Sequence, residues 1–317
     1  MPTDDHNALI NTPAVVAINV TENHEAEGMT ISGGSSVGMA LGGKIVQIEK
    51  QLFIGTAPGD SSGLSLSNGE IAVLGLTLEP MIPEVIVNGF VNINDDDPTV
   101  ETELNADSMA IGVAGPGVVS INDGAKMHAD KNLGIGYMGM GTVNVLAGGI
   151  LVSNMTTVVG GHNRADPFAA PDVLFDNPSA EGTLFVSGQN AEAQLGILFV
   201  GGNNGATGHV TVGGQGVGKA DVVAIAWGYG SEGQINVGVG SVFESTNDLE
   251  VAIRGNGGIG TSGIVKVSTN AYIGRGILGG VDPATGLPLP AANGTLEISG
   301  GGKFEAVNVG LLHFLKT

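Results

Sequence analysis

The chain has no cysteine, and its 317 residues include only 11 lysines and arginines against 31 aspartates and glutamates. Without cysteine it can form neither disulfides nor thiolate metal sites. A net charge of −20 at pH 7 repels nucleic acids and anionic membranes, so we expect neither as a partner. Cationic partners, divalent metals and plain solubility remain as interpretations of the acidic excess.

Aromatic residues and long apolar runs are also scarce. Aromatics make up 4% of the chain, which is few for an enzyme that holds sugars on aromatic platforms. No run of ~18 apolar residues occurs, so we expect no transmembrane helix. No segment keeps a 3.6-residue period over three turns, so helices are not expected. Residues 1–12 lack the basic and apolar segments of a secretory signal, and we expect a mature or partial product.

Glycine, at 55 residues, is abundant. The stretch from Leu133 to Asn154 consists of three short segments, 133–136, 142–146 and 150–153, joined by glycine corners. Each segment alternates apolar with small or polar residues, the period-two pattern of a half-buried strand. One such unit has no second layer against which to bury its apolar side chains, so it is expected to stack on copies of itself.

Copies of this unit begin at Leu52, Met109, Leu198, Ala224, Val251 and Ala271. A glycine at the start of the second strand marks the period, with spacings of 24, 41, 26, 25, 30 and 31 residues along Gly117, Gly141, Gly182, Gly208, Gly233, Gly263 and Gly294. The pattern predicts an all-β fold, a single-chain parallel β-helix (β-solenoid) with about ten coils of about 25 residues. We expect Gly141 to hold a positive φ in its corner.

The chain is predicted to form one solenoid domain. Residues 1–28 form an N-terminal extension, in which a β-prone run at 13–21 precedes an acidic tether, and residues 29–317 form the solenoid. Insertions at 161–181 and 276–293 interrupt the same corner four coils apart, or ~19 Å at ~4.8 Å per coil. They either build a binding face or show that exposed corners tolerate insertion.

Large side chains occupy the same column of corners. These are Tyr137, Trp227, Arg254 and Arg275. Trp227 and Arg254 fall on adjacent coils, which predicts a cation–π contact. That contact is either a small binding patch or a stacking interaction within the corner.

No catalytic or cofactor-binding constellation is found. Glycoside hydrolysis needs two carboxylates ~5–10 Å apart, whereas the repeats supply them one at a time, at Asp123, Glu232, Glu244 and Glu297. His162, Asp166 and Asp172 lie on the first insertion, where a lone histidine is usually solvated. Neither a nucleophile elbow nor a zinc-protease helix motif is present, and the glycine-rich strings are not followed by helices, which argues against dinucleotide binding.

An acidic loop at 95–107 is the one candidate metal site. Dense oxygen ligands of this kind could hold Ca²⁺, and the loop contains Asp95, Asp96, Asp97, Glu101, Glu103 and Asp107. No Asp-x-Asp-x-Asp-Gly loop and no Gly-Gly-x-Gly-x-Asp repeat is formed, so a solvated acidic loop is the other interpretation. We expect no other cofactor.

Repeats of the form Leu-x-Ile-Gly, Gly-Thr-Val-Asn-Val and Gly-Gly, over about residues 29–310, resemble the Gly-rich β-strand repeats of bacterial surface proteins. These include autotransporter-type passenger domains. The resemblance implies a right-handed parallel β-helix, export, and an adhesive or scaffold role. From residues 1–317 we expect no signal peptide, C-terminal β-barrel or anchoring helix, which would be a departure from the pattern.

We therefore expect an extracellular or cell-surface structural or adhesive β-solenoid, with a surface glycan as a further partner. Head-to-tail self-association into a filament is expected if the run at 13–21 lies across the apolar C-terminal coil, 307–317, of a neighbour. A truncated chain whose next coil is missing explains that apolar end equally well. The alternative function is a carbohydrate-active or polysaccharide-binding β-helix with its site on the inserted loops.

Overall fold

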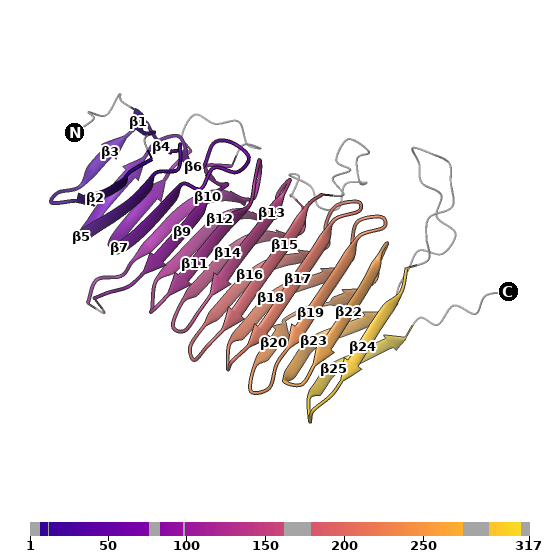
Figure 1. Ribbon diagram of the computed structural model, residues 1–317. Coiled ribbons are helices and arrows are strands. Elements are labelled where there is room, and N and C mark those ends of the chain that lie inside the picture. Colours follow the sequence, from indigo (N-terminus) through magenta and orange to yellow (C-terminus); the bar gives the residue numbers. More distant parts are fainter. Residues whose placement is uncertain are drawn as a thin grey trace, which may run out of the picture.

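The computed structural model describes residues 7–11, 13–75, 83–97, 99–161, 179–274 and 292–311. These residues form 25 β-strands and no helix. The strands pair in parallel and stack into an elongated solenoid whose coils follow one another from the N-terminal to the C-terminal end (Figure 1). Within these ranges no helix is long and apolar enough to cross a bilayer. The predicted all-β parallel solenoid is confirmed.

The strands are short where a corner interrupts them and long where the chain runs from one face into the next. In chain order they are β1 Asn7–Ile10, β2 Val15–Asn19, β3 His24–Ala26, β4 Gly28–Ile31, β5 Ser36–Ile48, β6 Leu52–Ile54, β7 Gly63–Val73, β8 Val85–Val87, β9 Phe90–Asn94, β10 Glu103–Ile111, β11 Gly117–Asn122, β12 Lys126–Ile135, β13 Met140–Val145, β14 Ile150–Val159, β15 Glu181–Ser187, β16 Glu192–Val200, β17 Thr207–Gly213, β18 Val217–Ile225, β19 Glu232–Val237, β20 Val242–Ser245, β21 Leu249–Val251, β22 Asn256–Thr261, β23 Ile264–Ile273, β24 Gly294–Ile298 and β25 Lys303–Leu311.

Each coil contributes to three faces. The first face holds β1, β4, β6, β8, β21 and the C-terminal ends of β10, β12, β14, β16, β18, β23 and β25. The second face holds β2, the first halves of β5 and β7, and then β9, β11, β13, β15, β17, β19, β22 and β24. The third face is made by β3, β20 and the remaining strand halves. The ten pairings of the second face join eleven strands in the described residues, close to the predicted about ten coils.

The core is a set of inward-pointing columns that run the length of the solenoid. Period-two alternation sends every other side chain inward, where it packs on its equivalents in the coils before and after. One first-face column is fully buried from Ile54 to Val251, through Val87, Ile111, Ile135, Val159, Val200 and Ile225. Burial of this apolar area, at about 25 cal/mol per Å², drives the stacking that one coil alone cannot achieve.

The corner between the first and second faces is formed by a column of left-handed residues. Each directly follows a first-face strand, and its φ lies between 54° and 78°. Its N–H donates to the preceding coil, for example from Gly136 to the Ile111 carbonyl at 2.9 Å. The column comprises Gly55, Gly112, Gly136, Gly160, Gly201, Ala226, Ala252 and Gly274. The predicted glycine corners are confirmed, with alanine in two coils.

Two details of the predicted glycine pattern were wrong. Gly141 is not among the residues with positive φ; it is the second residue of β13, and its lack of a side chain matters because a Cβ there would lie 2.1 Å from the Gly136 nitrogen. Gly263 is not the equivalent glycine of its coil, since Gly257 pairs with both Gly233 and Gly294. The corrected spacings are 24, 41, 26, 25, 24 and 37 residues, so only the two insertions break the period.

The predicted boundary of the N-terminal extension was also wrong. β1 pairs with β4, β2 with the first half of β5, and β3 with the second half of β5. Residues 7–11 and 13–26 therefore belong to a coil of the solenoid, with Val16 and Ile18 packed against the core. The run at 13–21 alternates in phase with the next coil, and its strand β2 pairs with β5 of the same chain.

An aspartate closes the corner between β6 and β7. Asp60 accepts hydrogen bonds from the backbone N–H groups of Gly33 at 3.2 Å, Gly34 at 3.1 Å, Thr56 at 3.1 Å and Ser62 at 3.0 Å, and from the Ser62 hydroxyl at 2.5 Å. Partial burial acts to raise the pKa of Asp60, but the hydrogen bonds from Ser62, Thr56 and Gly34 outweigh it and lower this pKa to about 2. Asp60 thus ties two consecutive coils together.

We expect Asp60→Ala to lower the free energy of unfolding at pH 6 by about 1–3 kcal/mol, because charged hydrogen bonds are lost. The folded-state pKa lies below the ordinary 3.8, so the contribution is present above pH 3.8 and is lost as the pH falls towards 2. Urea unfolding at several pH values, with the exposed Glu22→Ala as control, measures this. An equal deficit at pH 6 and pH 2 would contradict the ionised Asp60 as its cause.

Candidate functional site

The edge between the first and second faces carries the one aromatic and basic cluster of the described residues. Three successive loops, 201–206, 226–231 and 252–255, follow β16, β18 and β21 along this edge. Trp227 comes directly after the left-handed Ala226, and its ring meets that of Phe199 edge-on, with centroids 5.5 Å apart and planes at 64°. Phe199 belongs to an outer apolar cluster with Val158, Ala224 and Ile253. Contact with Phe199 and its cluster therefore fixes the position of the indole.

Arg254 lies over two aromatic rings. Its guanidinium carbon is 4.8 Å from the centroid of Trp227 and 5.0 Å from that of Tyr229. The predicted cation–π contact between Trp227 and Arg254 is confirmed. Sequence reasoning missed Tyr229, although its place two residues after Trp227 in an exposed corner would have been a signal. The structural equivalent of Trp227 in the next coil is Ile253, and Arg254 follows it.

Backbone hydrogen bonds fix the loops that carry these side chains. The Arg254 N–H donates to the Ala226 carbonyl at 3.0 Å, and the Gly230 N–H donates to the Arg254 carbonyl at 3.2 Å. On the other side, the Tyr229 N–H donates to the Asn204 side-chain oxygen at 2.9 Å. The three loops are thus joined coil to coil, and the aromatic and basic groups are presented in a fixed arrangement.

Polar donors in this cluster have no acceptor. The Nε and Nη1 atoms of Arg254 and the Nδ2 atom of Asn203 are buried and have no hydrogen-bond partner within the described part of the chain. By contrast, four lysines form ion pairs, Lys50 with Glu27, Lys126 with Glu103, Lys131 with Asp107 and Lys219 with Glu192. Two unpaired guanidinium nitrogens in a chain with such an excess of carboxylates distinguish Arg254 from these lysines, and its cluster is the strongest candidate site of the described residues.

The two insertions begin and end on the same edge. The first follows Gly160 and the second follows Gly274, both in the left-handed column, and the first-face strands before them are four coils apart. The shared corner predicted for the insertions is confirmed at these bases, and the Trp227 and Arg254 loops lie between them. His162, Asp166, Asp172 and Arg275 themselves lie outside the described residues.

In the acidic loop, the carboxylates of Asp95, Asp96 and Asp97 accept hydrogen bonds from their own turn, whereas Glu103 and Asp107 form ion pairs with lysines. Asp97 accepts hydrogen bonds from the Thr99 hydroxyl at 2.7 Å and the Thr99 N–H at 3.0 Å, which lower its pKa. Asp95 accepts from the Asp97 N–H, and Asp96 from the Asn94 amide. In the ranges described, no group of three metal-ligating side chains is formed. The expectation of Ca²⁺ at 95–107 gains no support from this geometry.

The single carboxylates predicted to be dispersed lie on different parts of the coil. Glu244 is in register between Lys219 and Lys266 on the third face, whereas Glu297 is on the second face and Asp123 is in a corner. Glu84, which sequence reasoning did not single out, is 9% exposed; its Oε2 accepts from the Ser108 N–H at 2.6 Å, and burial raises its pKa. None of these carboxylates faces another across a cleft.

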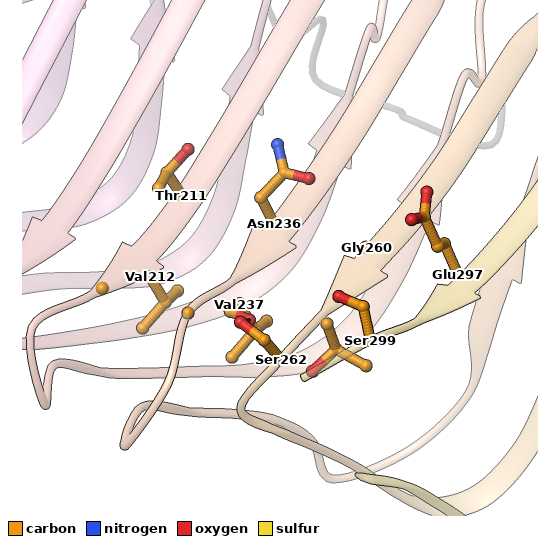
Figure 2. A pocket seen from close by; sticks show the side chains of 11 residues that line it. Thr211, Val212, Asn236, Val237, Gly260, Ser262, Glu297 and Ser299 are labelled. Carbon is orange, nitrogen blue, oxygen red and sulfur yellow. Dashed lines mark hydrogen bonds between the residues drawn. The ribbon is translucent and has the colours of Figure 1, made fainter. Parts of the chain in front are cut away.

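A shallow hollow of about 290 Å³ lies on the second face near its C-terminal end. Figure 2 shows Thr211, Asn236 and Glu297 on neighbouring strands, with the bare Gly260 between Asn236 and Glu297. The gap left by Gly260 forms the hollow, and Ser262 and Ser299 add hydroxyl groups to its wall. Its one carboxylate suits hydrogen bonding to hydroxyl groups but not the paired-carboxylate chemistry of glycoside hydrolysis.

Comparison with models of known protein families, with curated proteins and with solved structures finds no match.

Proposed function

We propose that this protein is a structural and adhesive β-solenoid of the cell surface, which binds polysaccharide through its second face. The observation that supports this proposal most directly is the segregation of charge between faces. In a chain of net charge −20, the two central outward columns of the second face contain one carboxylate, Glu297. The rest of these columns is mostly hydroxyl, amide and small residues.

The second face is rich in groups that hydrogen-bond to sugars. Its outward positions include Ser120, Thr142, Asn144, Thr183, Thr211, Gln234 and Asn236. Some of these side chains already bond along the face, as between Asn144 and Ser120 at 3.5 Å and between Gln234 and Asn236 at 3.1 Å. Regular spacing of ~4.8 Å between coils presents amides and hydroxyls to a polymer of hydroxyl groups in repeated rows.

The third face carries charged outward side chains, so it serves as the comparison for the second face within the same protein. One outward column there alternates in sign through Lys219, Glu244, Lys266 and Glu305. Charged side chains hold water, so docking this face on an uncharged polymer would cost desolvation that the second face avoids. Adhesion is therefore expected from the second face alone.

We expect the protein to bind an insoluble neutral polysaccharide such as cellulose, and to do so with little dependence on salt. Asn144→Glu and Thr211→Glu should each weaken binding about tenfold, because each puts an unpaired carboxylate into the contact. Gln194→Glu adds the same charge to the third face and serves as the control. Sedimentation binding isotherms measure the effect. Equal loss in all three variants would refute face-specific adhesion.

Carbohydrate-active catalysis, which is the alternative function, and head-to-tail assembly both stay untested predictions. A reducing-end and unsaturated-uronate assay addresses the first, with Asp166→Asn and Asp172→Asn as variants of the first insertion. The expected result is binding without turnover.

A further inference from the structure

We infer that the ring of Phe90 is a platform on which one sugar ring of the bound polysaccharide stacks, and that it selects β-linked glucans. The platform rests on the second-face adhesion proposed above, and it assigns a specificity-determining residue within that face. Phe90 is the first residue of β9, which pairs with β7 on one side and with β11 on the other (Figure 1).

The ring of Phe90 lies flat across a glycine of the preceding coil. Gly63 is the register partner of Phe90, and a Cβ built on Gly63 would be 2.0 Å from Cζ of Phe90 and 2.2 and 2.4 Å from its two Cε atoms. An edge-on ring would present only its Cζ end to that Cβ, so similar distances to three ring atoms show that one face of the ring covers Gly63. Strand side chains stand roughly perpendicular to their sheet, so the ring lies roughly parallel to it.

Covering Gly63 uses one face of the ring and leaves the other face toward solvent. Phe90 is 40% exposed, and Val118, its register partner in the next coil, is 37% exposed. The two side chains form an accessible apolar strip on the outside of the sheet. A flat aromatic face in such a strip offers a large apolar contact area to a flat ligand.

Uncharged polar groups lie beside this strip, in the neighbouring outward column. They are Ser65, Asn92 and Ser120, and no charged residue occupies the two central columns of β7, β9 and β11. The Asn122 amide donates to Oδ1 of Asn92 at 2.8 Å, which leaves the Nδ2 hydrogens of Asn92 as donors for a ligand. An apolar strip next to neutral hydrogen-bonding groups matches a neutral sugar, which has C–H faces and hydroxyl edges. A charged polymer would find no countercharge here.

The flat platform favours one kind of glycosidic linkage. In a β-linked glucan such as cellulose the hydroxyl groups and the linkages are equatorial, so the chain is an extended ribbon with C–H groups on both faces of each ring. In starch the same sugar is joined through axial α-linkages, which curve the chain away from a flat surface. Cellulose and starch therefore differ in shape but not in monomer, and they test the selectivity of the platform.

Sedimentation isotherms of the full chain with microcrystalline cellulose measure the contribution of the ring. Phe90→Leu keeps an apolar cover on Gly63 but removes the flat ring, and it should weaken binding about tenfold. Phe90→Tyr keeps the flat face and should bind as the parent does. Phe53→Ala is the matched control, because it removes an outward phenylalanine from the first face. Unchanged affinity in folded Phe90→Leu would overturn the platform.

Gly63→Ala tests the flat position while the ring stays in the chain. The added Cβ would overlap the ring, so the ring has to tilt off the sheet and binding to cellulose should fall. Granular starch should bind the parent about tenfold more weakly than cellulose does. Parent affinity in folded Gly63→Ala, or equal binding to starch and cellulose, would contradict a flat stacking platform.

The same isotherms separate failure of the platform from failure of the adhesion. If the parent does not bind cellulose, or if Asn144→Glu and Thr211→Glu bind as the parent does, the second-face adhesion itself is wrong. If those two variants lose binding while Phe90→Leu and Gly63→Ala keep it, the adhesion stands and the platform is wrong. Sedimentation velocity without sugar tests a second copy as the occupant. A shift from oligomer to monomer in Phe90→Leu would assign the strip to contact between copies and overturn the sugar platform.

Discussion

Gly136→Ala should destabilise the solenoid by about 2–4 kcal/mol, because it adds a clash to an already strained backbone position. Gly136 has φ +70°, and a Cβ built on it would lie 2.1 Å from the Glu181 carbonyl oxygen of the next coil. Positive φ alone does not explain the size of this effect, since Ala226 and Ala252 occupy the same column with φ of 54° and 57°. The next coil would have to move away from Gly136, and that would break the stacking on which the fold depends.

Two further glycine variants separate the cost of backbone strain at positive φ from the cost of the steric clash of an added Cβ. Gly230 has φ +65° with nothing within 4 Å of a built Cβ, so Gly230→Ala tests strain alone and should cost about 1 kcal/mol. Gly141 lacks positive φ, but its Cβ would lie 2.1 Å from the Gly136 nitrogen and 2.5 Å from the Ile111 carbonyl oxygen, so Gly141→Ala tests the clash alone. Urea unfolding should rank Gly136→Ala as most destabilising and Gly230→Ala as least. If Gly230→Ala costs as much as Gly136→Ala, the backbone contacts are not what requires glycine.

Phe243→Ala should lower the free energy of unfolding by about 3–5 kcal/mol, the usual cost of emptying a buried aromatic site. Phe243 is 2% exposed, in the inward column of the third face between Gly218 and Val265. Its ring occupies the space that Gly218 leaves, since a Cβ on Gly218 would lie 2.8 Å from Cδ2 of Phe243. Neighbouring coils cannot close this cavity without breaking their own strand pairing.

The control for Phe243 is Phe185→Ala, because Phe185 points outward on the second face and is only partly buried. It should cost much less. A double-mutant cycle with Gly218→Ala adds a second test. The added methyl should destabilise the parent but cost less beside Phe243→Ala, with a coupling of about 0.5–3 kcal/mol. Similar losses for Phe185→Ala and Phe243→Ala, or no coupling to Gly218, would contradict this packing.

The sequence by itself determined the class of fold. Alternation with period two, glycine corners and a repeat of about 25 residues are local properties, and a unit such as 133–154 has no stable form except a stacked one. Even the contact of Trp227 with Arg254 followed from counting coils, because stacking brings residues about one repeat apart into contact.

Only the tertiary structure decided which residues share a column and which lack a partner. A one-residue slip of a strand exchanges its inward and outward side chains, and insertions make the register hard to read from the sequence. The sequence therefore could not show whether Gly257 or Gly263 is the equivalent glycine of its coil. Nor could it show that the run at 13–21 is a strand of the solenoid and not a detached tail. Backbone and side chains from neighbouring coils likewise decide the φ of Gly141 and the missing acceptors of Arg254 and Asn203. They also decide the small number of carboxylates in the central columns of the second face. The period and composition of a segment determine that alternate residues face outward. Which residues become neighbours across the coils is determined only when the strands pair in one register.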